Sequence, residues 1–229
     1  MRLHPDIDPQ AIRAAFAPER RARLVNVLAP EMAAQLGATL EHDVSYATII
    51  GTRSGPRVLF PDELAAMSPT DRKALSQEMM ADAADGIGYH YHGHQIPGST
   101  HPVLKQFEHW LNAPDTLGFI REVTGIADIT SADAQATRYV GGHYLTRHLD
   151  DPANERRRLA YVFSFTERWH PDWGGLLQFY ARNGTPRNAW APAMNALALF
   201  EVSHVHAVTY VTPFAKAPRL SITGWFRAD

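Results

Sequence analysis

The sequence contains no cysteine, and this absence removes several kinds of chemistry at once. Disulfide bonds, zinc sites built on thiolates and cysteine nucleophiles are all excluded, although the absence says little about the compartment. No hydrophobic run approaches the roughly 18 residues that a membrane span requires. The first ten residues carry charge and proline instead of the apolar stretch of a secretory signal. We therefore expect a soluble cytoplasmic protein with no membrane partner.

An excess of positive charge is also missing, because the formal net charge is −2 at pH 7. No global basic field argues for nucleic acid, so no nucleic-acid partner is expected. The 229 residues, 45% of them hydrophobic, suffice for one sizeable core. We predict a single domain over residues 1–229, and the sequence leaves its oligomeric state open.

The pattern of elements changes near residue 128. Residues 1–127 form a helix-rich part, with helices expected near 8–16, 30–40, 68–84, 101–112 and 115–124. A strand is expected at 44–50, a turn at 51–56 and an extended segment at 87–96. From 128 to 229 short β-rich runs alternate with turns such as 151–154; the runs are 134–140, 143–149, 158–166, 175–180, 187–190, 196–201, 205–211 and 219–226. This order predicts an α+β fold with supporting N-terminal helices and a C-terminal, cupin-like jelly roll as the catalytic core.

A histidine and an aspartate two residues apart stand at the end of one expected strand, as His148-Leu149-Asp150. On an extended strand His148 and Asp150 point to the same side, and Leu149 is expected to face the opposite side and pack into the sheet. A second histidine from another strand would complete a two-histidine, one-carboxylate face, which suits a non-haem Fe(II) ion that activates O2. Alone the pair is weak, because such a pair is more often a surface hydrogen bond.

Two later strands carry residues that strengthen the metal hypothesis. His204 and His206 alternate on one strand, so both would face the same side and only one of them need bind a metal. Arg219 shares a face with Ser221 and Thr223 on the last strand. A buried guanidinium needs a partner, and its planar fork matches a carboxylate.

The ordered set of motifs resembles the prolyl-hydroxylase-type branch of the 2-oxoglutarate/Fe(II)-dependent oxygenases. The resemblance is to bacterial prolyl 4-hydroxylase-like enzymes and the related ribosomal-protein prolyl hydroxylases, and it covers about residues 128–227. The motifs are Tyr139-x4-Tyr144-x3-His148-x-Asp150, Trp173-Gly174-Gly175-x-Leu177, His206-x-Val208-x2-Val211 and Arg219-Leu-Ser-Ile-Thr-Gly-Trp-Phe226.

The resemblance implies a double-stranded β-helix with Fe(II) bound by His148, Asp150 and His206, which are then both the metal ligands and the catalytic residues. It favours His206 over His204, which becomes a neighbouring or pocket residue. It also implies O2 and 2-oxoglutarate as cosubstrates, with ascorbate as an additional candidate.

The same resemblance places the distal carboxylate of 2-oxoglutarate on Arg219. Tyr139 matches a position that contacts the cosubstrate, and Ser221 is expected to add a hydroxyl donor. Relatives often carry a tyrosine that hydrogen-bonds this carboxylate where Ser164 stands here. We therefore expect Ser221 or Thr223 to compensate, or the cosubstrate pocket to be altered.

The activity implied is hydroxylation of a prolyl residue in a protein or peptide, with release of succinate and CO2. One alternative is hydroxylation of a free amino acid or other small metabolite, which a deep closed pocket would favour over an open groove. Another is a non-oxidative cupin-like metal-binding protein, which would leave Arg219 without a role.

A histidine-rich segment before residue 97 has several interpretations. His90, His92 and His94 alternate, so a strand would align them on one face, with Tyr89 and Tyr91 on the other. They could form a separate metal site, line the pocket or belong to an ordinary strand. We favour the last two, because histidines at this spacing alone are weak evidence.

Overall fold

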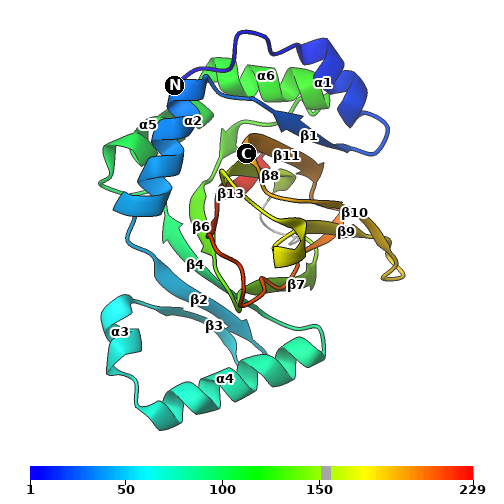
Figure 1. Cartoon of the computed structure of the whole chain (residues 1–229). Helices are drawn as coiled ribbons and strands as arrows, with labels where there is room; N and C mark the ends of the chain where they lie inside the picture. The colour runs from blue at the N-terminus through cyan, green and yellow to red at the C-terminus, as the bar shows by residue number, and fades with distance from the viewer. Residues whose placement is uncertain (151–155, 229) are drawn as a thin grey trace.

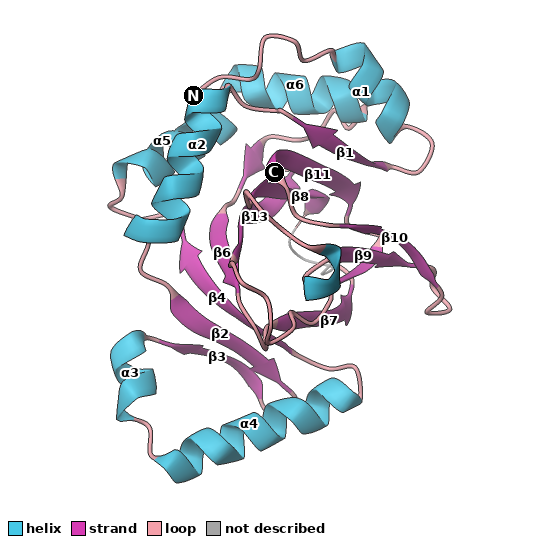
Figure 2. Cartoon of the chain, viewed as in Figure 1, coloured by secondary structure: helices cyan, strands magenta, loops and turns pink. Residues whose placement is uncertain are grey.

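The computed structural model describes residues 1–150 and 156–228, so the turn expected at 151–154 lies outside them. Within these residues, 13 strands join one antiparallel sheet that curls into a half-barrel. Helices pack outside the curled sheet (Figure 1), and Figure 2 shows how the strands curl around. The predicted α+β jelly-roll fold is confirmed.

Prolines mark the start of every α-helix in the described part of the chain, at the first or second helical position. Proline fits there because its fixed φ suits a helix and its missing N–H would have no helical partner. The helices are α1 (Pro9–Phe16), α2 (Pro30–Ala38), α3 (Pro61–Ala66), α4 (Pro69–Ala84), α5 (Pro102–Leu111) and α6 (Pro114–Thr124). A π-helix, Thr39–Asp43, continues α2. No helix in residues 1–150 or 156–228 is long and apolar enough to span a bilayer.

Four strands come from the expected helix-rich part: β1 (Arg21–Val25), β2 (Ala47–Thr52), β3 (Gly55–Leu59) and β4 (Tyr89–Gln95). The sequence did not predict β1, β3 or α3. The turn expected over 51–56 is shorter than predicted, because β2 continues to Thr52, β3 begins at Gly55 and only Arg53 and Ser54 form the turn. β1 pairs with β11, and β4 pairs with β6 and β7, so the sheet joins strands from both sides of residue 127.

All eight β-rich runs expected after residue 128 are strands. The strands of this part are β5 (Ser131–Ala132), β6 (Gln135–Tyr139), β7 (Tyr144–His148), β8 (Arg157–Phe165), β9 (Leu177–Tyr180), β10 (Pro186–Trp190), β11 (Met194–Glu201), β12 (Val205–Val208) and β13 (Arg219–Arg227). A short 3₁₀-helix, Pro171–Trp173, precedes β9.

The main core lies between the N-terminal helices and the sheet. Phe107 of α5 is fully buried and meets Phe163 of β8 edge to face, with ring centroids 5.5 Å apart. Leu36 of α2 and Leu199 of β11 belong to the same cluster. Because helices and sheet share this cluster, we propose that residues 1–229 form one domain.

Replacement of Phe107 by alanine tests this proposal. We expect Phe107→Ala to lower the free energy of unfolding by about 3–5 kcal/mol, because it leaves a cavity between helix and sheet. In urea, far-UV circular dichroism and tryptophan fluorescence should move together to a lower midpoint. Phe214→Ala is the control, since Phe214 is 62% exposed and its loss should change stability by at most about 0.5 kcal/mol. Separate transitions from the two probes would show that the chain is not one cooperative domain.

Candidate active site

A cavity of about 870 Å³ lies inside the half-barrel and contains the predicted metal ligands. His148 is the last residue of β7, Asp150 follows two residues later, and His206 lies on β12. β12 pairs antiparallel with β7 and places His206 directly opposite His148. The register of two strands therefore brings together histidines that are far apart in the sequence, with ring centroids 4.2 Å apart.

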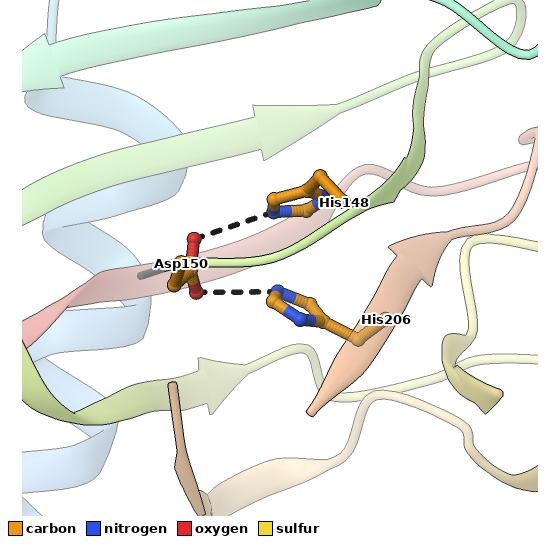
Figure 3. A group of neighbouring side chains, drawn as sticks. All are labelled: His148, Asp150 and His206. Atoms are coloured by element: carbon orange, nitrogen blue, oxygen red, sulfur yellow. Dashed lines mark ion pairs between the residues drawn. The ribbon is translucent and has the colours of Figure 1, made fainter. Parts of the chain in front are cut away.

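Each histidine directs one ring nitrogen at a different oxygen of Asp150 (Figure 3). His148 Nε2 lies 3.4 Å from Oδ1, and His206 Nε2 lies 3.3 Å from Oδ2. One ligand atom from each of the three residues lies within 4.8 Å of the others, and no other such group occurs among the described residues. This spacing is compact enough for one ion to contact all three, so the donor set fits the predicted Fe(II) ion.

The other nitrogen of each ring contacts the backbone two residues earlier. His148 Nδ1 lies 2.9 Å from the carbonyl oxygen of Thr146, and His206 Nδ1 lies 3.0 Å from that of His204. A carbonyl accepts only, so each Nδ1 carries a proton, and each Nε2 can bind a metal once it is deprotonated.

The charges inside the triad suit a divalent cation. Burial, followed by the charge of the neighbouring His148, lowers the pKa of His206 to about 4. Burial opposes ionisation of Asp150, yet the hydrogen bond from His148 and the charges of both histidines keep its pKa below the usual value. Burial likewise lowers the pKa of His148, but the hydrogen bond and charge of Asp150 outweigh it and raise that pKa. At neutral pH the site thus holds a carboxylate beside a neutral His206.

His204 and Leu149 are neighbours of the triad that do not belong to it. His204 is partly buried and its ring packs edge to face against Phe179 at 5.9 Å, outside the triad. The expectation that Leu149 packs into the sheet is wrong, because its side chain is 53% exposed and lies on the lining of the cavity. β7 ends at His148, so the alternation of a strand no longer fixes the direction of the next side chain.

Arg219 lies in the same cavity and is almost completely buried. Its Nη1 donates to Ser221 Oγ at 3.2 Å, and its Cζ lies 5.1 Å from the centre of the Tyr139 ring. Its Nε is buried without a hydrogen-bond partner, and no carboxylate of the described residues lies within ion-pair distance. A buried cation in this state is costly and suits an anionic ligand.

The polar groups around Arg219 extend further than the sequence predicted. Ser221 Oγ lies 3.0 Å from Thr137 Oγ1, and Thr137 also lines the cavity. Ser164 is opposite Ser221 in the sheet, but its hydroxyl accepts a hydrogen bond from the backbone N–H of Ala193 at 3.1 Å. The hydroxyls of Ser221 and Thr137 therefore continue the polar group that begins at Arg219, whereas the Ser164 hydroxyl is bonded to the backbone. Thr137 could have been found from its place two residues before Tyr139 on one face of β6.

The tyrosines of β4, not its histidines, line the cavity. Tyr91 stacks on Tyr139 with ring centroids 5.3 Å apart. His90 and His92 lie against His143, at 4.2 and 4.5 Å between ring centroids. The pocket-lining interpretation of the histidines is therefore wrong.

The comparisons with known proteins agree with this geometry. Residues 134–227 match the family model of the 2OG-Fe(II) oxygenase superfamily, and this range contains all six predicted site residues. A comparison with curated proteins finds no match.

Solved structures show the same fold at low sequence identity. A prolyl-4-hydroxylase from Pseudomonas putida has a TM-score of 0.65 and 19% identity, over 97% of this chain and 100% of that one. An oxidoreductase of the 2OG-Fe(II) oxygenase family from Burkholderia pseudomallei has a TM-score of 0.64 and 13% identity, over 99% and 93%. A prolyl hydroxylase from Trichoplax adhaerens, solved with a hypoxia inducible factor peptide fragment, has a TM-score of 0.64 and 17% identity, over 96% and 89%.

The match over residues 134–227 indicates a dioxygenase that works with Fe(II), 2-oxoglutarate and O2. Its fold is the one found in solved prolyl hydroxylases, as the resemblance predicts. A dioxygenase is an oxidative enzyme, so the alternative of a non-oxidative, cupin-like metal-binding protein is not supported.

Metal titration of three alanine variants tests the ligand assignment. We expect His148→Ala and His206→Ala to weaken Fe(II) or Mn(II) binding by more than about 100-fold, since even the loss of a residue that only orients a ligand typically costs about 10- to 100-fold. His204→Ala is the matched control and should bind within about threefold of the wild type. Anaerobic isothermal titration measures the affinities, and an equal loss in His204→Ala would overturn the choice of His206.

Substitution of Arg219 by methionine separates ligand binding from stability. We expect the metal-free, cosubstrate-free Arg219→Met protein to be as stable as the wild type or more so, because an uncompensated buried charge is removed. The same variant should bind 2-oxoglutarate about 30- to 150-fold more weakly, the loss expected for a charge-assisted hydrogen bond. The affinity of Arg219→Lys for 2-oxoglutarate should lie between those of the wild type and Arg219→Met. Thermal unfolding with and without 2-oxoglutarate measures both effects, and a full ligand-induced shift in Arg219→Met would contradict the assignment.

Proposed function

We propose that this dioxygenase hydroxylates a prolyl residue in a protein or peptide and releases succinate and CO2. One observation carries the proposal: the triad shares a large cavity, open beside His148, with Arg219, which has no ion-pair partner among the described residues. The side chain of His148 is 29% exposed, whereas those of Asp150 and His206 are 9% and 6% exposed. A substrate that reaches the site from the exposed side can belong to a longer chain.

The proposed roles follow from the positions of the side chains. His148, Asp150 and His206 would hold the iron, which supplies the oxidising power that inserts one oxygen atom into a C–H bond. One atom of O2 then enters the alcohol and the other enters succinate, as 2-oxoglutarate loses CO2. The reaction is therefore balanced in atoms and electrons without any further reductant.

The protein itself contributes binding, orientation and exclusion of water. Arg219 would bind the distal carboxylate of 2-oxoglutarate, and the Ser221 hydroxyl would keep the guanidinium in place. Tyr139, completely buried beside Arg219, would form a wall of the cosubstrate pocket. The apolar side chains of Leu145 and Val208 line the cavity near the triad and reduce its contact with water.

The neighbours with the same fold support the polypeptide substrate by analogy, since one is titled a prolyl-4-hydroxylase and another was solved with a peptide fragment. Hydroxylation of a free amino acid is the competing proposal, and the exposed side of the cavity argues against it. A cytoplasmic location and a role for ascorbate remain predictions.

Turnover assays with two kinds of substrate test the proposal. A library of synthetic peptides, each with one central proline, and free L-proline are incubated with Fe(II), 2-oxoglutarate and O2. We expect succinate formation to be coupled to oxidation of the proline in some peptides, with kcat/KM at least about 100-fold higher than for free proline. Mass spectrometry locates the added oxygen. Asp150→Ala should be inactive, and turnover confined to free amino acids would refute the polypeptide assignment.

A further inference from the structure

A second cavity, of about 520 Å³, lies beside the C-terminal end of α4, against β7, β9 and β12. Its lining includes three tyrosines and a methionine, and we call it the tyrosine groove: Met80, Tyr144, Tyr180 and Tyr210. The hydroxyl of Tyr144 donates to the backbone carbonyl of Met79 at 3.2 Å, which joins β7 to α4. In Figure 1 this end of α4 lies close to β7.

The tyrosine groove adjoins the active-site cavity. Gly86, Thr146 and Arg147 line both cavities. Thr146 is only two residues before the proposed ligand His148, so the groove begins next to the metal site. A chain that leaves the active-site cavity past these residues would enter the groove directly.

Apolar side chains are exposed on both sides of this junction. Met80 and Tyr210 of the groove are 59% and 46% exposed, and Leu149 on the active-site lining is 53% exposed. The rings of Tyr144 and Tyr210 lie nearly parallel, 6.4 Å between centroids and 25° between planes. Exposed apolar groups gathered around one cavity mark a surface that binds a partner.

A positive charge stands at the same junction. Arg147 is exposed, and its guanidinium lies 5.5 Å from the centre of the Tyr180 ring. No carboxylate of the described residues lies within ion-pair distance of it. The groove therefore pairs aromatic surfaces with one cation that has no ion-pair partner in the described part of the chain.

We propose that the tyrosine groove binds a polypeptide segment in the polyproline II conformation that carries an acidic residue, as the continuation of the substrate chain outside the active-site cavity. The inference rests on the proposed function, because it names the substrate sequence next to the hydroxylated proline. Aromatic grooves bind proline-rich segments because the extended helix is preformed and loses little entropy. Arg147 selects a carboxylate near the entrance by a charge-assisted hydrogen bond.

Binding of three labelled peptides tests the groove without turnover. The probes are a ten-residue polyproline peptide, the same peptide with two central glutamates, and a glycine-serine peptide of equal length. By fluorescence anisotropy we expect the glutamate-containing peptide to bind most tightly and the glycine-serine peptide most weakly. Met80→Ala/Tyr210→Ala should weaken both proline peptides by about 5- to 30-fold, as is usual for exposed anchor side chains. Arg147→Gln should weaken only the glutamate-containing one.

Phe214→Ala is the matched control, since Phe214 is exposed but lies on neither cavity lining, and its affinities should equal those of the wild type. Proline peptides that bind no better than glycine-serine, or an unchanged affinity in the double variant, would overturn the proposal. So would a dimer, seen by analytical ultracentrifugation, that Met80→Ala/Tyr210→Ala converts to a monomer, because the groove would then be occupied by a second copy.

The groove and the proposed function can fail separately. If peptides bind the groove but no prolyl peptide is hydroxylated, the function is wrong and the groove stands. If a prolyl peptide is hydroxylated with the same KM by the wild type and by Met80→Ala/Tyr210→Ala, the function stands and the groove is wrong.

Discussion

The pairing of β12 with β7 is the constraint on which the active site depends. This antiparallel register sets His206 opposite His148, and the short step from His148 to Asp150 brings the carboxylate between the two rings. The pairing is irregular just beyond this point, because the register shifts between His206 and Val208. Such a bulge turns a strand locally and redirects its side chains, and bulges are frequent near active sites. Near this bulge, residues of β7 line both the active-site cavity and the tyrosine groove.

On β13 the fold places the charge of Arg219 in a buried position. β13 lies between β6 and β8 in the sheet, and Arg219 at its start lies opposite Tyr139 of β6 with only 3% of its surface exposed. The backbone thus fixes a guanidinium in a buried position, where Ser221 supplies only part of its hydrogen bonds. Natural proteins accept such local instability where a ligand later compensates it. The destabilising charge is therefore itself an indication of an anion-binding role.

The sequence predicted those parts that local chemistry decides. Prolines such as Pro69 and Pro102 mark the first residue of a helix, because a proline at that position loses no hydrogen bond. The runs that became β8 and β11 are buried over nearly their whole length, and their apolar composition made them recognisable. β1 was missed because its five residues include two arginines, and it is a strand by virtue of its pairing with β11. Pairing partners far apart in the sequence are invisible to a local pattern.

The errors in the site have a related cause. Alternation correctly separates Tyr89 and Tyr91 from His90 and His92, but it does not say which face of β4 turns toward the cavity. That choice is made by the neighbours: Gly51 has no side chain to occupy the space that the Tyr89 ring fills. The motif residues were found because the resemblance orders them along the chain. Thr137 was missed because it belongs to none of the motifs, and the contact that gives it a role is with Ser221 on another strand.

Electrostatics links the two ends of the active-site cavity. Among the described residues, Asp150 has no cation beyond the histidines and Arg219 has no carboxylate, so each end lacks the charge that the iron or 2-oxoglutarate would bring. A divalent iron and a doubly charged oxo acid would bring the formal charges of the two residues and the two ligands to zero. In a low-dielectric cavity such compensation is strong, because unpaired charges there interact over longer distances than in water. Binding of iron near Asp150 therefore favours binding of 2-oxoglutarate near Arg219, and the reverse. This coupling explains why one half-barrel contains both a buried carboxylate and a buried guanidinium.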